Sequence, residues 1–309
     1  MNHKVLPNAQ PKGEFLRWMD ESVERYGTSP TEVDFEAVQS FVGKMRPMFG
    51  PDRAYFQTDV QGWDNIPEAP SLIVCNHSGG TSIPDTWGLG ISWYQHFGST
   101  RAIHALAHEM VFALKATAVP FSKLGILRAN REMAARVLTE FKRDLVVYPG
   151  GDLDTWRPWK DRYKVRFAGR KGYARLALRT GAPIVPVAQA GSHSTLIVLS
   201  DGQKVAKKLR FKKYFRASIF PVHFSFPFGL SIGPTPHLPP PCKLRYRIAP
   251  AIHPPKLPPG TEPTEEMVDD LDRRVRAAMQ AQLDLLRDEA LPLRKRLGRL
   301  AARVSRKIA

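Results

Sequence analysis

Short apolar runs and amphipathic stretches alternate through the middle of the chain. The runs Leu72–Cys75, 145–148 and 184–188 are almost continuously apolar, as expected for strands that are buried on both faces of a sheet. Residues 131–142 and 167–180 carry apolar side chains at helical spacing. This order of strand, helix and strand predicts an α/β fold with a largely parallel central sheet and flanking helices.

Both ends of the chain have a helical pattern. Residues 12–50 contain two amphipathic stretches around a Gly-Thr-Ser-Pro break, which predicts an N-terminal helical hairpin. Residues 262–290 predict another helix, and 293–308 predict a basic C-terminal amphipathic helix of the kind that lies in a membrane interface. We therefore expect three parts, an N-terminal helical segment (1–53), a main domain (54–260) and C-terminal helices with a basic amphipathic tail (261–309).

The charge of the chain narrows the choice of partners. Its 309 residues include 46 Lys and Arg against 29 Asp and Glu, which gives a formal net charge of +17. Such a surplus favours acidic lipid headgroups, phosphorylated small molecules or nucleic acid as partners. The two cysteines, Cys75 and Cys242, provide no disulfide framework and are typical of a reducing compartment.

We expect neither a signal peptide nor a membrane-spanning helix. The N-terminus lacks the apolar core of a signal peptide, and the apolar run 219–232 is shorter than the ~20 residues that a span requires. Residues 204–216, just before this run, are basic with interleaved aromatic residues. These patterns predict a peripheral protein on the cytoplasmic face of a membrane, held there by 204–232 and the basic tail.

The stretch 71–85 contains the leading candidate for catalysis. His77 follows a predicted strand, and Gly79 and Gly80 form a loop whose backbone N–H groups are able to approach a ligand. Asp85 follows at the start of a predicted helix. A histidine at the end of a strand with an acidic partner has the arrangement of a general base.

A second turn and several arginines complete the set of candidate site residues. The strand predicted at 145–148 ends at Gly150 and Gly151, whose backbone N–H groups are a second candidate for holding an oxyanion. Guanidinium groups suit phosphate because their planar donors match its oxygens. The candidate phosphate-binding residues are Arg128, Arg131 and Arg170.

Four motifs follow one another along the chain. They are Asn76-His77 with a downstream Asp, Gly125 to Arg128, Tyr148-Pro149-Gly150-Gly151, and 170–177 running into Val185-Pro186-Val187. In this order and rough spacing, about residues 60–250 resemble the glycerolipid acyltransferase superfamily, which includes the lysophosphatidate acyltransferases. The last motif is similar to the branch that makes triacylglycerol from diacylglycerol.

The sequence departs from both branches. Asp85 lies eight residues after His77, whereas the phospholipid branch has its Asp five residues after the His. Tyr148-Pro149-Gly150-Gly151 stands where that branch has Phe-Pro-Glu-Gly. The His-Pro-His-Gly and Glu-Pro-Gly-Gly motifs of the diacylglycerol branch are not met in full. The resemblance therefore leaves the acceptor open between a lysophospholipid and diacylglycerol.

The resemblance implies an O-acyltransferase that moves a fatty acyl group from acyl-CoA, or from acyl carrier protein, to a lipid hydroxyl. Neutral His77 would take the hydroxyl proton, and Asp85 would fix its tautomer and favour the imidazolium that forms. A thioester is already activated, so neither a covalent nucleophile nor a cofactor is expected. The implied partners are the thioester donor, the lipid acceptor and an anionic membrane surface, and not nucleic acid.

Other classes of protein fit parts of the sequence. Residues 229–233, Gly-Leu-Ser-Ile-Gly, have the spacing of a serine hydrolase elbow, but prolines follow where that elbow needs a helix. The charge suits a nucleic-acid binder, although no nucleic-acid module is evident. A non-catalytic protein of the membrane surface would share the charge and the tail. His104 and His108 have the spacing of a metal pair, but without a third ligand we expect polar packing.

Overall fold

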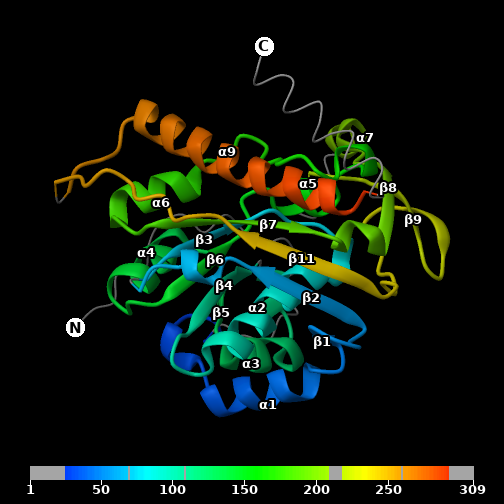
Figure 1. Cartoon of the computed structure of the whole chain (residues 1–309), viewed down its shortest axis with the longest axis horizontal. Coiled ribbons are helices and arrows are strands. Elements are labelled where there is room, and N and C mark those ends of the chain that lie inside the picture. The colour runs from blue at the N-terminus through cyan, green and yellow to red at the C-terminus, as the bar shows by residue number, and fades with distance from the viewer. Residues whose placement is uncertain (1–24, 69, 108, 209–217, 259, 292–309) are drawn as a thin grey trace.

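The computed structural model describes residues 25–68, 70–107, 109–208, 218–258 and 260–291 (Figure 1). The strands of its central sheet are β1 (Phe49–Gly50), β2 (Phe56–Gln61), β3 (Leu72–Cys75), β4 (Ile103–Ala107), β5 (Ile126–Arg128), β6 (Asp144–Val147), β7 (Ile184–Ala190) and β11 (Cys242–Ile248). The helices are α1 (Phe35–Met45), α2 (Pro84–Phe97), α3 (Lys115–Lys123), α4 (Arg131–Thr139), α5 (Gly151–Thr155), α6 (Gly172–Thr180), α7 (Gln203–Lys208) and α9 (Glu265–Glu289).

The central sheet is largely parallel, which confirms the predicted fold class. Within the described residues its strands follow the order β1-β2-β11-β7-β3-β6-β4-β5. The five strands from β7 to β5 are mutually parallel, and β11 pairs antiparallel to β7. The strands β7, β3 and β6 are neighbours, so their carboxyl ends open at the same edge of the sheet.

Helices cover both faces of the sheet, and this explains the apolar runs. Side chains alternate between the two faces of a strand, so a strand that is covered on both sides needs apolar residues throughout. In β3, Leu72 and Val74 pack with α4, α6 and α9, whereas Ile73 and Cys75 pack with α1 and α2. Figure 1 shows α6 and α9 on one side of the sheet and α1 and α3 on the other.

Some predicted elements shift in the structure. The helix predicted over 167–180 begins only at Gly172, because Ala168 and Gly169 have left-handed backbones with φ of +53° and +72°. The helix predicted around 111–117 is replaced by a short 3₁₀ turn, Glu109–Phe112, followed by α3. Residues 102–106, ambiguous between strand and helix, form the parallel strand β4.

A second sheet was not predicted. It consists of β8 (Leu196–Ser200), β9 (Val222–Ser225) and β10 (Gly229–Ile232) in the order β10-β9-β8, with all neighbours antiparallel. In Figure 1, β8 and β9 lie at the right-hand edge of the molecule, beside α7. The apolar run 219–232 therefore supplies two strands of this sheet.

Several predictions lie wholly or partly outside the described residues. These are the first helix of the N-terminal hairpin, the basic C-terminal amphipathic helix, and most of the basic stretch 204–216. The division of the chain into three parts stays a prediction, although α1 and α9 pack directly on the two faces of the central sheet. Among the described residues, no helix combines the length and the apolar character that a membrane crossing demands.

The close approach of β7 and β11 gives a test of the fold. Gly191 follows β7 with φ +116°, and a Cβ there would lie 1.9 Å from the carbonyl oxygen of Lys243. We expect Gly191→Ala to lower the free energy of unfolding by about 2–4 kcal/mol in urea titration, through backbone strain and overpacking. Gly43→Ala is the control, because Gly43 lies in α1 with open space around it. It should be neutral or stabilise by up to ~1 kcal/mol, and equal effects of the two changes would contradict the prediction.

Candidate active site

A direct hydrogen bond joins His77 and Asp85. Nδ1 of His77 lies 2.8 Å from Oδ2 of Asp85, and the two side chains are only 13% and 1% exposed. The same oxygen accepts the backbone N–H of Ser78 at 2.8 Å, and Oδ1 accepts that of Thr86 at 2.9 Å. With the proton on Nδ1, Nε2 is the basic atom of the ring, as a general base requires.

The loop between these residues explains how an eight-residue separation still allows contact. Gly79 and Gly80 have φ of +102° and +63°, and the single 3₁₀ turn Gly80–Ser82 follows. Ile83 is also left-handed, with φ +39°, and the chain then enters α2 at Pro84. The loop between the two residues thus turns back, and Asp85 lies against the ring of His77.

Asn76 fixes the point at which the chain leaves the sheet. Its side-chain Nδ2 donates to the carbonyl of Gln189 at 3.0 Å, and its Oδ1 accepts the backbone N–H of Gln189 at 2.7 Å. The pairing of β3 with β7 ends at Cys75 and Val187, so the Asn76 amide continues the ladder in place of a backbone. The backbone is then free to turn, and it presents His77 beyond the edge of the sheet.

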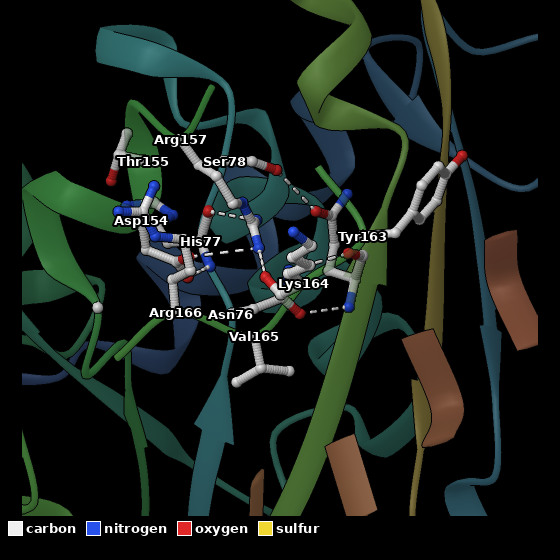
Figure 2. Close-up of polar contacts among 12 residues, drawn as sticks. Asn76, His77, Ser78, Asp154, Thr155, Arg157, Tyr163, Lys164, Val165 and Arg166 are labelled. Carbon is white, nitrogen blue, oxygen red and sulfur yellow. Dashed lines mark hydrogen bonds and ion pairs between the residues drawn. The ribbon is translucent and has the colours of Figure 1, made fainter. Parts of the chain in front are cut away.

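A buried ion pair holds the peptide of His77 (Figure 2). The backbone N–H of His77 donates to Oδ2 of Asp154 at 2.6 Å, and Arg157 donates to the His77 carbonyl at 3.2 Å. Asp154 and Arg157 lie 3.4 Å apart, with side chains 0% and 2% exposed. Burial raises the pKa of Asp154 although Arg157 opposes this. Arg157 also donates to the carbonyl of Lys164, so it joins three segments of the chain.

The environment of His77 determines its charge. Burial disfavours the imidazolium, but the carboxylate of Asp85 and, more weakly, that of Asp154 outweigh burial and raise the pKa of His77 above its ordinary 6.5. The ring of Tyr148 lies 4.6 Å from that of His77, tilted by 37°. Burial raises the pKa of the Tyr148 phenol well above its ordinary value, so this neighbour stays neutral.

The second glycine turn lies next to the first. Gly150 packs so closely that a Cβ would lie 2.2 Å from the Asp154 side chain. Arg170 braces the turn, because it donates to the Gly150 carbonyl at 2.8 Å and pairs with Asp152 at 2.8 Å. The backbone N–H of Gly151 donates to the carbonyl of Tyr148 at 3.1 Å. That N–H is therefore already engaged within the turn.

The structure does not bring Arg128 to His77. Arg128 ends β5, the edge strand, which β6 and β4 separate from β3. It donates to the carbonyl of Tyr26 at 2.8 Å, pairs with Glu109, and lies 4.8 Å from the centre of the Phe112 ring. These contacts connect the start of the described chain to the sheet and give Arg128 a structural role.

Two hollows on opposite faces of the sheet reach Tyr148, the neighbour of His77. A basic groove between α4 and α6 contains Arg131, Arg170 and Lys171 and reaches Tyr148. An apolar cavity of about 80 Å³ between α1, α2 and the sheet reaches the same tyrosine and Thr86. Tyr148 lines both hollows, so an apolar surface and a basic surface lie on the two sides of the residue that contacts the ring of His77.

Two alternatives find no support in the geometry. Ser231 lies in the antiparallel strand β10 and is followed by no helix, so it is not on a nucleophile elbow. His104 is buried, with Nδ1 2.9 Å from the carbonyl of Gly125 and Nε2 3.3 Å from Arg143, and burial lowers its pKa to about 4. His108 lies outside the described residues. Around His104 the contacts are those of polar packing.

Sequence reasoning missed Asp154, Arg157 and Gln189. A local signal existed for the first two, because an acid and an arginine three residues apart stand among Leu153, Thr155 and Trp156. Charged residues in such an apolar setting are buried only when they are paired. Gln189 gave no local signal, since its contacts with Asn76 span 113 residues.

An α/β sheet that ends in a buried His–Asp pair, a glycine loop and a basic groove is an arrangement suited to general-base catalysis. Residues 57–190 match the family model described as Acyltransferase. The matched range includes His77, Asp85 and Asp154.

Several curated proteins are similar to this chain over part of their length. An uncharacterised protein of Mycobacterium tuberculosis is 30% identical over 185 residues, 60% of this chain and 49% of its own length. A Gallus gallus protein named DGAT1/2-independent enzyme synthesizing storage lipids is 28% identical over 199 residues, 62% of this chain and 55% of its own. The chain thus spans about half the length of the curated relatives it matches.

One solved structure is similar in outline. It is the 1-acyl-sn-glycerophosphate acyltransferase of Thermotoga maritima, with 18% identity and a TM-score of 0.46. The similarity covers 81% of this chain and 83% of that chain.

The Asp154–Arg157 pair gives a test of the site. We expect Asp154→Asn to lower the free energy of unfolding by about 3–5 kcal/mol, because it leaves the buried Arg157 without a counter-charge. Adding Arg157→Met should cost less than the sum of the two single changes, as urea titration would measure. Glu140→Gln, which breaks the exposed pair with Arg136, is the control and should cost under ~1 kcal/mol. Additive effects of the two buried changes would contradict this account.

Proposed function

We propose that this protein is a membrane-associated O-acyltransferase. It moves a fatty acyl group from acyl-CoA, or from acyl carrier protein, to a hydroxyl of a lipid acceptor such as a lysophospholipid or diacylglycerol. The observation that carries the proposal is the 2.8 Å contact between His77 and Asp85 at the end of β3. This pair lies within the residues that match the Acyltransferase family model.

The residues of the site suit a direct transfer. Nε2 of neutral His77 takes the proton of the acceptor hydroxyl as its oxygen attacks the thioester carbonyl. Asp85 holds the Nδ1 proton and favours the imidazolium that forms. Backbone N–H groups in the loop of Gly79 and Gly80 receive the oxyanion. The tetrahedral intermediate then collapses, the C–S bond breaks, and the imidazolium returns its proton to the leaving thiolate.

The two hollows suit the two halves of a thioester donor. The apolar cavity beside Tyr148 has the chemistry for the end of an acyl chain that adjoins the reacting carbonyl. The basic groove with Arg131 and Arg170 has the chemistry for phosphate groups of the donor or acceptor. The names of two similar proteins, a storage-lipid enzyme and an LPA acyltransferase, support a lipid acceptor.

The reaction is tested by transfer from a long-chain acyl-CoA or acyl carrier protein in anionic liposomes. The acceptors are lysophospholipids, diacylglycerol and long-chain alcohols, and lipid mass spectrometry identifies the product. We expect one acceptor class to give product with the wild type, and His77→Ala to lower the rate by at least about 100-fold, because it removes the general base.

His253→Ala is the matched control, since His253 is exposed and lies after β11, away from His77. It should keep the wild-type rate. If neither donor gives product while liposome binding persists, the proposal of an enzyme is wrong, and a non-catalytic protein of the membrane surface takes its place. If His77→Ala and the wild type have equal rates, the proposed reaction stands but His77 is not its base.

The raised pKa of His77 predicts the pH dependence. The base must be neutral, so kcat/KM should fall with decreasing pH through a pKa that lies above 6.5. Asp85→Asn removes the main charge that raises this pKa, and burial then lowers it. We expect the acid limb of the profile to move to lower pH, with a maximum rate reduced by about 100-fold or more.

Asp269→Asn is the control for this change, because Asp269 is exposed and pairs with Lys171 on the surface of α9. Its pH profile should match the wild type. An acid limb that stays at the same pH in Asp85→Asn would show that Asp85 does not control the ionisation of His77.

A further inference from the structure

The small sheet β8–β9–β10 exposes apolar side chains where water-facing strands normally carry polar ones. Phe226 and Phe228, in the turn between β9 and β10, are 64% and 66% exposed. Most of the exposed large apolar side chains among the described residues lie on this sheet or beside it. We call the following residues the apolar sheet face: Ile197, Leu199, Phe224, Phe226, Phe228, Leu230 and Ile232.

The strand register shows that this is one continuous surface. Phe224 pairs with Ile197 on one side and with Leu230 on the other, so the three side chains form a row across the sheet. Their neighbours along the strands, such as Val198 and His223, are buried on the opposite face. Contiguous exposed apolar surface of this kind marks an interaction site.

The opposite face of the same sheet packs against the active-site loop. Leu196 and Val198 pack with Trp156, next to the buried Arg157. Ser82 of the loop lies 3.1 Å from His237, which follows β10. The small sheet therefore lies between its own apolar sheet face and the loop that follows His77.

Positive charge borders the apolar sheet face. Lys204, Lys207 and Lys208 are exposed on α7, which follows β8 directly. The acid in that connection, Asp201, is paired with Arg166 at 3.5 Å. An apolar surface with a cationic border matches the interface of a bilayer that contains anionic lipids.

We propose that the apolar sheet face inserts into the surface of an anionic lipid bilayer, with the lysines of α7 on the headgroups. The inference deepens the proposed function and rests on it only in placing the lipid acceptor beside the loop of His77. A second copy of the chain would bring two lysine-rich α7 helices together. If the basic tail 292–309 covered the face instead, its positive charges would lie beside the lysines of α7. Charge complementarity therefore favours the bilayer.

Vesicle binding of the full chain tests the inference. The probes are vesicles of phosphatidylcholine with phosphatidylglycerol, and of phosphatidylcholine alone, assayed by co-sedimentation. We expect the doubly substituted Phe226→Ser/Phe228→Ser protein to bind the mixed vesicles at least about tenfold more weakly than the wild type, because two aromatic rings no longer enter the bilayer. Leu285→Ser, which removes an exposed leucine on α9, is the matched control and should bind as the wild type does.

A fluorescent probe reports contact directly and does not depend on a loss of binding. With Leu230→Cys labelled by an environment-sensitive dye, mixed vesicles should raise and blue-shift the emission, and the same label at Leu285→Cys should not respond. Unchanged emission at position 230, or equal vesicle binding by the doubly substituted protein, would overturn the inference. Emission that is already blue-shifted without vesicles would also overturn it, because another part of the chain or a second copy would then cover the face.

The same assays in the His77→Ala background separate this inference from the proposed function. Vesicle binding there should equal that of the wild type, since the apolar sheet face is unchanged. Binding without acyl transfer to any acceptor by the wild type would remove the proposed function and leave the membrane surface standing. Acyl transfer without vesicle binding would remove the inference about the apolar sheet face and leave the acyl-transfer activity standing.

Discussion

The site depends on the way the backbone of His77 is held at the end of β3. Its N–H donates to Asp154 and its carbonyl accepts from Arg157, while its ring donates to Asp85. The two backbone bonds hold the peptide and the bond to Asp85 orients the imidazole, which is the fixed geometry that catalysis by a side chain requires before substrate arrives. The Asn76 amide, bonded twice to Gln189, sets the position from which this peptide leaves the sheet.

The hold on His77 extends to α9, far along the chain. Gln280 of α9 accepts the N–H of Val165 at 3.0 Å and donates to the carbonyl of Tyr163 at 2.9 Å. The carbonyl of the residue between them, Lys164, accepts a hydrogen bond from Arg157 (Figure 2). The buried Asp154–Arg157 pair is costly to desolvate, so its value lies in geometry more than in stability. This gives α9 a part in placing His77 as well as in covering the sheet.

The sequence was sufficient where local pattern and fold agree. The apolar run of β3 predicted a buried parallel strand, and an acid downstream of His77 predicted a pair that the structure joins at 2.8 Å in spite of the eight-residue spacing. Gln189 was missed because its partner Asn76 lies 113 residues away, whereas the pair of Asp154 and Arg157 did have a local signal and only the contact of Asp154 with His77 is distant in the sequence. The phosphate-binding role expected for Arg128 stays a prediction, and its contacts with Tyr26 and Glu109 were not predicted because a strand end alone does not show which way a side chain turns. The strands β9 and β10 were missed because alternation predicts a water-facing face that is polar, and here that face is apolar.

Tyr148 shows how one residue relates the sheet to the proposed reaction. It follows β6, contacts the ring of His77, and lines both the apolar cavity and the basic groove. The cavity lies on the α1–α2 face of the sheet and the groove on the α4–α6 face, and Tyr148 lines both. A thioester has the same division, with an apolar acyl chain on one side of the reacting carbonyl and a phosphate-bearing carrier on the other. Under the proposed function the two halves of the donor would therefore lie on the two sides of the tyrosine that contacts His77.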